Sequence, residues 1–110
     1  MICVSVDRSR EVTNAVPVRL KVLGEPTRLE IVRRLAVEDL CTCHLVEELG
    51  IAQPLMSHHL RVLRDAGIVR NEACGAFTYY VLERPVLSEI ADLLGALASA
   101  PGSPRRRPCS

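Results

Sequence analysis

The sequence predicts a small, mainly α-helical domain that carries one β-hairpin. Apolar residues recur at helical spacing in five segments, residues 68–82 change to an alternating pattern, and glycine or proline separates most of the segments. The chain has 110 residues, of which 48% are hydrophobic and only 3% aromatic, so aliphatic side chains must fill its core. Because a chain this short buries a modest core, we expect two copies to associate through a shared apolar surface.

The first two predicted helices are marked by the residues at their ends. Val16, Leu20 and Leu23 fall at helical spacing, and Gly24 ends the run. Pro26 suits the first position of a second helix. The buried face of that second helix is expected to contain Leu29, Ile31, Val32, Leu35 and Ala36.

Two shorter helices follow in the sequence. The first should begin near Thr42 and end at Gly50, and a two-residue connection leads to the second, over residues 53–66. Gly67 closes this second short helix. Its apolar stripe is expected to contain Met56, Leu60 and Leu63.

The alternating pattern then predicts two strands, Ile68–Ala73 and Phe77–Leu82, which form a hairpin around Cys74-Gly75. Pro85 begins a last helix. The apolar side of this helix is expected to contain Leu87, Ile90, Ala91, Leu94 and Leu97. The predicted order is therefore α-α-α-α-β-β-α, and two short helices, a tight turn and a hairpin make a winged helix-turn-helix.

The folded domain is expected to span residues 14–100. Residues 1–13 lack clear periodicity and predict a flexible N-terminal arm, whereas residues 101–110, rich in Pro, Ser and Arg, predict a disordered basic tail. No apolar stretch reaches the ~20 residues of a membrane span, and no secretory signal is visible, so we expect a cytoplasmic protein without a membrane partner.

Five cysteines are many for so short a chain. In a reducing cytosol, clustered cysteines more often bind metals or sense redox state than form structural disulfides. Cys41 and Cys43 are also too close on a helix for an ordinary structural bridge. The three histidines lack a paired nucleophile and base, so we expect no enzyme activity.

The most informative motif is Cys41-Thr42-Cys43-His44, at the start of a predicted short helix. Thiolates select thiophilic ions such as arsenite, antimonite, Cd(II), Pb(II) or Zn(II) over hard cations. Residues i and i+2 lie about 200° apart on a regular helix, but a helix start can leave that geometry and bring both sulfurs together. Ligation there is expected to distort the first turn of the helix.

Four segments stand in order along the chain: Glu25–Leu29, Asp39–Leu45, Gln53–Leu60 and Tyr79-Tyr80. Together they resemble the ArsR/SmtB family of metal(loid)-responsive transcriptional repressors, nearest to the arsenite and cadmium/lead sensors with Cys-x-Cys on the third helix. The resemblance covers roughly residues 16–98. The resemblance implies a homodimer joined through its first and last helices, which binds double-stranded operator DNA and releases it when a ligand binds.

Arsenite prefers three thiolates, so Cys41 and Cys43 need a further ligand. Related cadmium and lead sensors recruit N-terminal cysteines from the partner subunit, which makes Cys3 the first candidate, ahead of Cys109 and His44. Zinc, nickel and cobalt sensors of the family use histidines on the last helix, and residues 85–100 contain none. The expected inducer is therefore arsenite or antimonite, with Cd, Pb or Zn as the alternative.

Two other interpretations of the cysteine pair stay open. Cys41 and Cys43 could be oxidised rather than metallated, in a thiol redox-sensing regulator of the same fold. They could also be half-buried residues that bind nothing. A metal carrier or thiol oxidoreductase is disfavoured, because a carrier needs no DNA-reading helix and the chain has no Cys-x-x-Cys motif.

The second short helix of a helix-turn-helix enters the major groove of DNA with its N-terminal part. The expected DNA contacts are Gln53, Ser57, His58, His59 and Arg61. The chain departs from the family pattern in two places: Ala52 replaces a capping Ser, and the hairpin offers only Arg70 as a basic residue. The tail arginines, 105–107, could contribute phosphate contacts instead.

Overall fold

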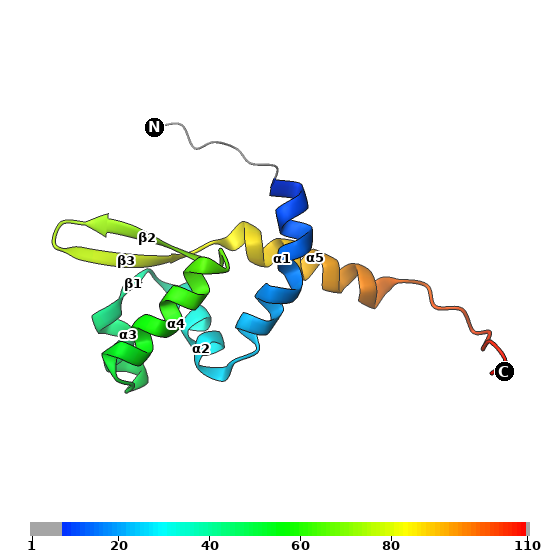
Figure 1. Cartoon of the computed structure of the whole chain (residues 1–110), viewed down its shortest axis with the longest axis horizontal. Helices are drawn as coiled ribbons and strands as arrows, with labels where there is room; N and C mark the ends of the chain where they lie inside the picture. Colours follow the sequence, from blue (N-terminus) through cyan, green and yellow to red (C-terminus); the bar gives the residue numbers. More distant parts are fainter. Residues whose placement is uncertain (1–7, 110) are drawn as a thin grey trace.

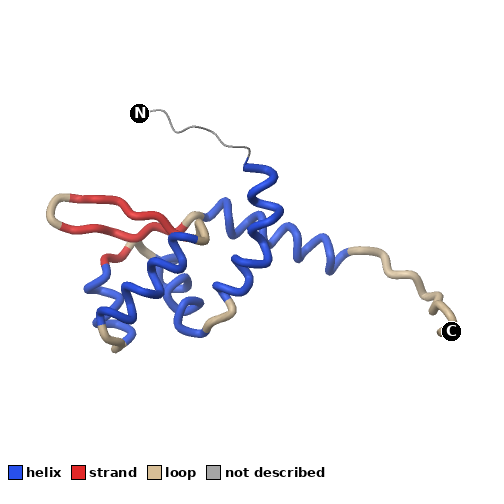
Figure 2. Tube along the Cα trace, in the orientation of Figure 1, coloured by secondary structure: helices blue, strands red, loops and turns tan. Residues whose placement is uncertain are grey.

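The computed structural model describes residues 8–109, with side chains from residue 15 onward. Five helices and three short strands are present in this part of the chain (Figures 1 and 2). In chain order they are α1 (Arg8–Leu23), α2 (Pro26–Val37), β1 (Leu40–Cys41), α3 (Thr42–Leu49), α4 (Gln53–Asp65), β2 (Val69–Cys74), β3 (Phe77–Leu82) and α5 (Arg84–Ser99).

The architecture confirms the predicted winged helix-turn-helix. Helices α2, α3 and α4 pack together, and the β2–β3 hairpin extends from them as the wing, at one end of the long axis in Figure 1. Helices α1 and α5 lie on the other side of α2 and α4, and the chain beyond α5 continues away from the wing.

The start of the first helix and one added strand are the main differences from the sequence-based prediction, and other element ends shift by one residue. Helix α1 begins at Arg8, so residues 8–13, expected in the arm, are helical. These residues have little apolar periodicity, but they contain no glycine or proline that would stop a helix, and α1 even continues through Pro17. The structure also adds β1, a strand of only two residues that is too short to produce a detectable alternating pattern.

Strand β1 completes a three-stranded antiparallel sheet with the order β1-β3-β2. Leu40 pairs with Tyr80 and Cys41 pairs with Tyr79, so the residues just before α3 are hydrogen-bonded to the wing. Strand β1 thereby fixes the start of α3 against the hairpin.

The core lies around one face of α4. Met56, Leu60 and Leu63 on this face are fully buried. They pack in one cluster with residues of α2, α3 and the base of the hairpin, including Ile31, Leu35, Leu45, Ile68 and Val69. The predicted face of α2 is confirmed for Ile31, Val32 and Leu35, whereas Leu29 and Ala36 are exposed because they lie at its edges.

The helix ends follow ordinary capping rules, with one exception. The carboxylate of Glu25 accepts a hydrogen bond from the Arg28 N–H at 2.9 Å and caps α2. Gly50 ends α3 with φ of 67°, a left-handed conformation that favours glycine. Ala52 stands at the N-cap of α4 and makes no side-chain cap there, as expected from the sequence.

Truncation of the central stripe of α4 should strongly destabilise the domain. We expect Leu60→Ala to lower the free energy of unfolding by about 2–5 kcal/mol, because it leaves a cavity in a fully buried site. Val37→Ala, at a position 84% exposed, is the matched control and should change it by less than about 0.5 kcal/mol. Urea denaturation followed by circular dichroism measures both, and equal effects would contradict this description of the core.

Candidate functional site

Cys41, Cys43 and His44 form a compact group of soft ligands at the start of α3. Their potential ligand atoms all lie within 4.8 Å of one another. Cys41 is buried, while Cys43 and His44 are exposed, so the group opens to solvent on one side. In the described part of the chain, no other cluster of three or more such side chains has this arrangement.

The extended backbone of Cys41 brings the two sulfurs together. Cys41 ends β1 and is also the N-cap of α3, with φ of −87° and ψ of 167°. A regular helix would point residues 41 and 43 about 200° apart, but only Cys43 is helical here. The expectation that a helix start can bring both sulfurs to one place agrees with this geometry.

The two cysteines form a disulfide, with their Cα atoms 5.5 Å apart. This corrects the expectation that the two cysteines are too close on a helix for an ordinary structural bridge. That expectation assumed helical geometry at both residues, whereas the extended Cys41 removes the conflict. A disulfide has no thiolate, so only the reduced pair offers two sulfur ligands to a soft ion.

His44 makes two polar contacts with Cys41. Its Nδ1 accepts the Cys41 N–H at 3.4 Å and lies 3.2 Å from the Cys41 Sγ. The imidazole therefore helps to cap α3 and lies beside the sulfur ligands. An adjacent imidazole nitrogen and two sulfurs are a donor set that suits thiophilic ions.

The remaining cysteines are not part of this group in the described residues. Cys3, the first candidate for a third ligand, lies outside the residues that the structure describes. Cys74 is at the tip of the wing and Cys109 is near the end of the tail, and both are free and exposed.

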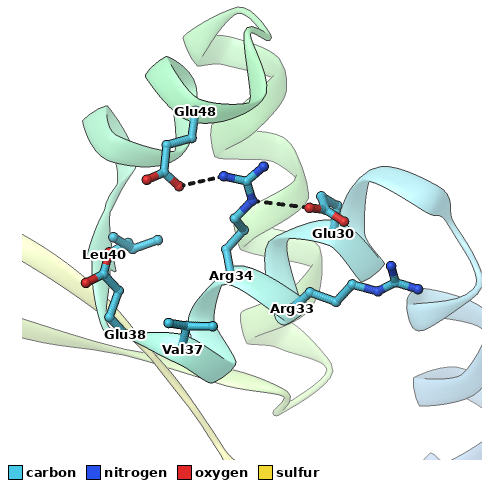
Figure 3. Close-up of a pocket in the computed structure, with 7 residues that line it drawn as sticks. All are labelled: Glu30, Arg33, Arg34, Val37, Glu38, Leu40 and Glu48. Carbon is cyan, nitrogen blue, oxygen red and sulfur yellow. Dashed lines mark hydrogen bonds and ion pairs between the residues drawn. The ribbon is translucent and has the colours of Figure 1, made fainter.

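An open groove lies between α2 and α3, and its lining includes Leu40, the residue before Cys41 (Figure 3). Its volume is about 350 Å³. Arg34 of α2 donates to Glu30 on its own helix at 3.2 Å and to Glu48 of α3 at 3.1 Å. These carboxylates raise the pKa of Arg34. Helix α3 is thus held near its C-terminal end by Arg34 and at its start by the β1–β3 pairing.

Four of the five residues expected to contact DNA share the exposed surface of α4. Gln53, Ser57, His58 and Arg61 are all exposed, and His58 and Arg61 lie roughly opposite the buried stripe of this helix. An amide, a hydroxyl, an imidazole and a guanidinium on one face can bond to base edges and phosphates.

His59 does not share this face, and its burial disagrees with the expected DNA contact. It is only 7% exposed, because it lies at the edge of the apolar stripe where α2 and its capping residue cover it. Its Nδ1 lies 3.3 Å from Arg28 Nη1 and 3.9 Å from Glu25 Oε2. Burial lowers the pKa of His59, and the positive charge of Arg28 adds to this effect against the opposing Glu25 carboxylate.

The wing has little free positive charge. Arg70, its basic residue, donates to Glu72 at 2.8 Å and forms a second ion pair with Glu83. These two carboxylates raise the pKa of Arg70 and occupy its guanidinium. The tail arginines 105–107 are exposed, but the tail leaves α5 at the opposite end of the molecule from the wing (Figure 1).

Comparisons with known proteins identify the family. Residues 25–71 match the family described as bacterial regulatory proteins of the arsR type. The arsenical resistance operon repressor of Staphylococcus aureus is 35% identical over 78 residues, which cover 71% of this chain and 75% of the relative. The chain belongs to the ArsR/SmtB family. It is therefore a DNA-binding transcriptional regulator and not an enzyme.

Solved structures agree with this membership. The crystal structure of a possible transcriptional regulator for arsenical resistance has a TM-score of 0.65 and 32% identity, covering 72% of this chain and 82% of the other. A homodimeric winged helix-turn-helix domain from Mycobacterium bovis has a TM-score of 0.67 at 23% identity, covering 88% of this chain and 90% of the other, and supports the fold alone.

Within the described residues, none of the helices is long and apolar enough to cross a membrane.

The depressed pKa of His59 should make this regulator less stable in mild acid. The folded state favours the neutral imidazole, so stability from this group is present above pH 6.5 and is lost as the pH falls through and below that value. Urea unfolding at pH 7.5 and pH 5.5 measures the difference. His59→Asn should reduce this pH dependence, while His58→Asn, at an exposed neighbouring position, should retain it. An unchanged slope in His59→Asn would contradict the assignment.

Release of Arg70 from its two carboxylates should strengthen DNA binding. In the double variant Glu72→Gln/Glu83→Gln, the guanidinium is free to reach a phosphate. The slope of log affinity against log salt should then become steeper by about one unit. Fluorescence anisotropy at several salt concentrations tests this. Glu47→Gln, on the exposed surface of α3, is the control for the loss of one negative charge. An equal slope in the double variant and the wild type would show that Arg70 does not reach DNA.

Proposed function

We propose that this protein is a homodimeric repressor that leaves its operator when a thiophilic ion binds Cys41 and Cys43, and that the inducer is arsenite or antimonite. The observation that carries the proposal is the cluster of two sulfurs and an imidazole within 4.8 Å at the start of the helix-turn-helix. The relative named as an arsenical resistance operon repressor supports the choice of ion. Cd, Pb or Zn are the alternative inducers.

The reduced cysteine pair supplies two of the ligands that such an ion requires. We propose that Cys3 supplies the third, with Cys109 and His44 as alternatives. His44 already lies 3.2 Å from the Cys41 sulfur, so it can complete a site within one chain. Arsenite favours a third thiolate over an imidazole, which keeps Cys3 the first choice.

The signal passes from the ion to the DNA-binding surface through the backbone of Cys41. This residue is hydrogen-bonded to the wing through its pairing with Tyr79, and it is the N-cap of α3. Helix α3 in turn packs on α4. Movement of the Cys41 backbone on ligation therefore changes both the wing and the support of the DNA-reading helix.

Helix α4 reads the operator DNA in this proposal. Gln53 and Ser57 lie in the N-terminal part of the helix and contact base edges, while His58 and Arg61 contact bases or phosphates. The Arg70 ion pairs leave the wing a minor role in phosphate binding. We also propose a cytoplasmic location, where the regulator can reach genomic DNA and its thiols stay reduced.

The homodimer forms through α1 and α5. In the single chain, several large apolar side chains of these helices are exposed. They are Val18, Leu20, Leu93, Leu94 and Leu97. Burial of this surface against a second copy would remove it from water, and two copies would present two α4 helices to a two-fold symmetric operator.

The Cys41–Cys43 disulfide supports a second candidate, a thiol redox-sensing regulator. A peroxide that oxidises the pair would accept two electrons and yield water, and the resulting disulfide would bind no ion. The same Cys41 backbone would transmit either input, so the two candidates differ in the inducer and not in the output.

Removal of either sulfur should abolish the response without loss of DNA binding. We expect arsenite to weaken operator binding by the wild-type protein about 10-fold or more under reducing conditions, and to leave Cys41→Ser and Cys43→Ser unaffected. Cys74→Ser, at the wing tip, is the matched control and should respond fully. Anisotropy titrations of the promoter upstream of its own gene provide the measurement.

Parallel titrations distinguish the inducers. Response to arsenite alone supports the metalloid proposal, whereas response to peroxide alone supports the redox candidate. If Cys41→Ser and Cys43→Ser both respond like the wild type, the cysteine pair is not the sensing site.

A further inference from the structure

Two arginines connect α1 to α4, although neither belongs to the metal site or to the DNA-reading surface. Arg28 of α2 forms the first connection. Its Nε donates to the Val22 carbonyl of α1 at 2.8 Å, and its Nη1 donates to His59 Nδ1 of α4 at 3.3 Å. One guanidinium thus joins the last turn of α1 to the middle of α4.

Arg19 of α1 forms the second connection. Its Nε donates to the carbonyl of Ala66, the C-cap residue of α4, at 2.8 Å. Its side chain is 12% exposed, and its Nη1 lies 3.9 Å from a carboxylate oxygen of Glu89 in α5. Gly67 makes room for it, because a Cβ at that position would lie 3.0 Å from Arg19 Nη2.

The two connections together constrain the direction of α4. One acts at His59, near the middle of the helix, and the other at Ala66, at its C-terminal end. Two fixed points along a rigid helix determine how its axis is oriented relative to α1. Guanidinium groups suit this role, because they present several donors in a planar, rigid geometry that a lysine does not reproduce.

We propose that Arg19 and Arg28 are positioning residues that set the orientation of the reading helix α4 relative to the dimer helix α1, and thereby the operator half-site spacing that the dimer accepts. This inference rests on the homodimer of the proposed function, but not on its inducer. In a dimer joined through α1 and α5, the angle between α1 and α4 fixes the separation of the two reading helices. Half-site spacing follows from that separation.

The test measures affinity as a function of spacing. The operator is located by footprinting the promoter upstream of the gene, and duplexes are made with the two half-sites moved apart or together by one and two base pairs. The wild-type protein should favour one spacing by about 10-fold over its neighbours. Arg28→Met and Arg19→Met should reduce this preference to less than about threefold, because each removes one of the two polar connections that restrict the orientation of α4 relative to α1.

Conservative variants separate geometry from charge. Arg28→Lys keeps the charge but cannot reach both acceptors, so it should lose the preference as Arg28→Met does. Arg33→Met, an exposed arginine on the same helix, is the control and should keep it. His59→Asn retains an acceptor near Nδ1 and should behave as the wild type, whereas His59→Leu should not.

Each outcome decides the proposal. An arginine variant that binds duplexes of every spacing more weakly by the same factor has lost stability rather than positioning, and this result would overturn the proposal. A spacing preference in Arg28→Met equal to that of the wild type would also overturn it. If the arginine variants fail to fold, the His59→Asn and His59→Leu pair decides by the same measurement. A wild-type protein without a spacing preference would also overturn it.

The result is separable from the proposed function. No inducer is present, so an absent arsenite response leaves this test intact. Analytical ultracentrifugation of the same samples reports dimerisation independently, and a monomeric wild-type protein would refute the proposed dimer together with this inference.

Discussion

Helix α4 must satisfy two requirements on opposite faces, and this constraint shapes the rest of the structure. Its buried stripe supplies the centre of a small aliphatic core, while its exposed face carries the polar residues that suit DNA. Only the apolar face is supported by packing, so the orientation of the helix depends on what surrounds it. Helices α2 and α3 cover the stripe, and the base of the hairpin closes it. Polar contacts from Arg19 and Arg28 then restrict the remaining freedom.

Cys41 concentrates several roles in one residue. It ends a strand, caps a helix, and offers a sulfur to the ligand group. A ligand that pulls on this sulfur therefore acts on hydrogen bonds in two directions, toward β3 and toward α3. A cysteine on an exposed helical turn would lack this connection, because its side chain could move into solvent without changing the backbone hydrogen bonds.

The sequence predicted those parts of the fold and site that depend on local signals. Helix ends at Gly24, Pro26 and Gly50 follow from residue chemistry, and the stripe of α4 follows from helical period. Strand β1 was missed because Leu40 pairs with Tyr80, 40 residues further along the chain, and a strand of two residues has no detectable period. The burial of His59 could not be predicted for a similar reason: an edge position is exposed or buried according to its neighbours, here Glu25 and Arg28.

The short pairing of β1 with β3 also has a consequence for folding. Contact between Leu40 and Tyr80 closes a loop that contains α3, α4 and the first wing strand. Closing this loop costs chain entropy, and that cost is offset only when the enclosed elements pack. The extended backbone that brings the two sulfurs together is therefore a property of the completed fold and not of the four-residue motif. An ion that binds the folded arrangement more tightly than the open chain would raise the stability of the whole domain, so ion binding at this group would be coupled to folding.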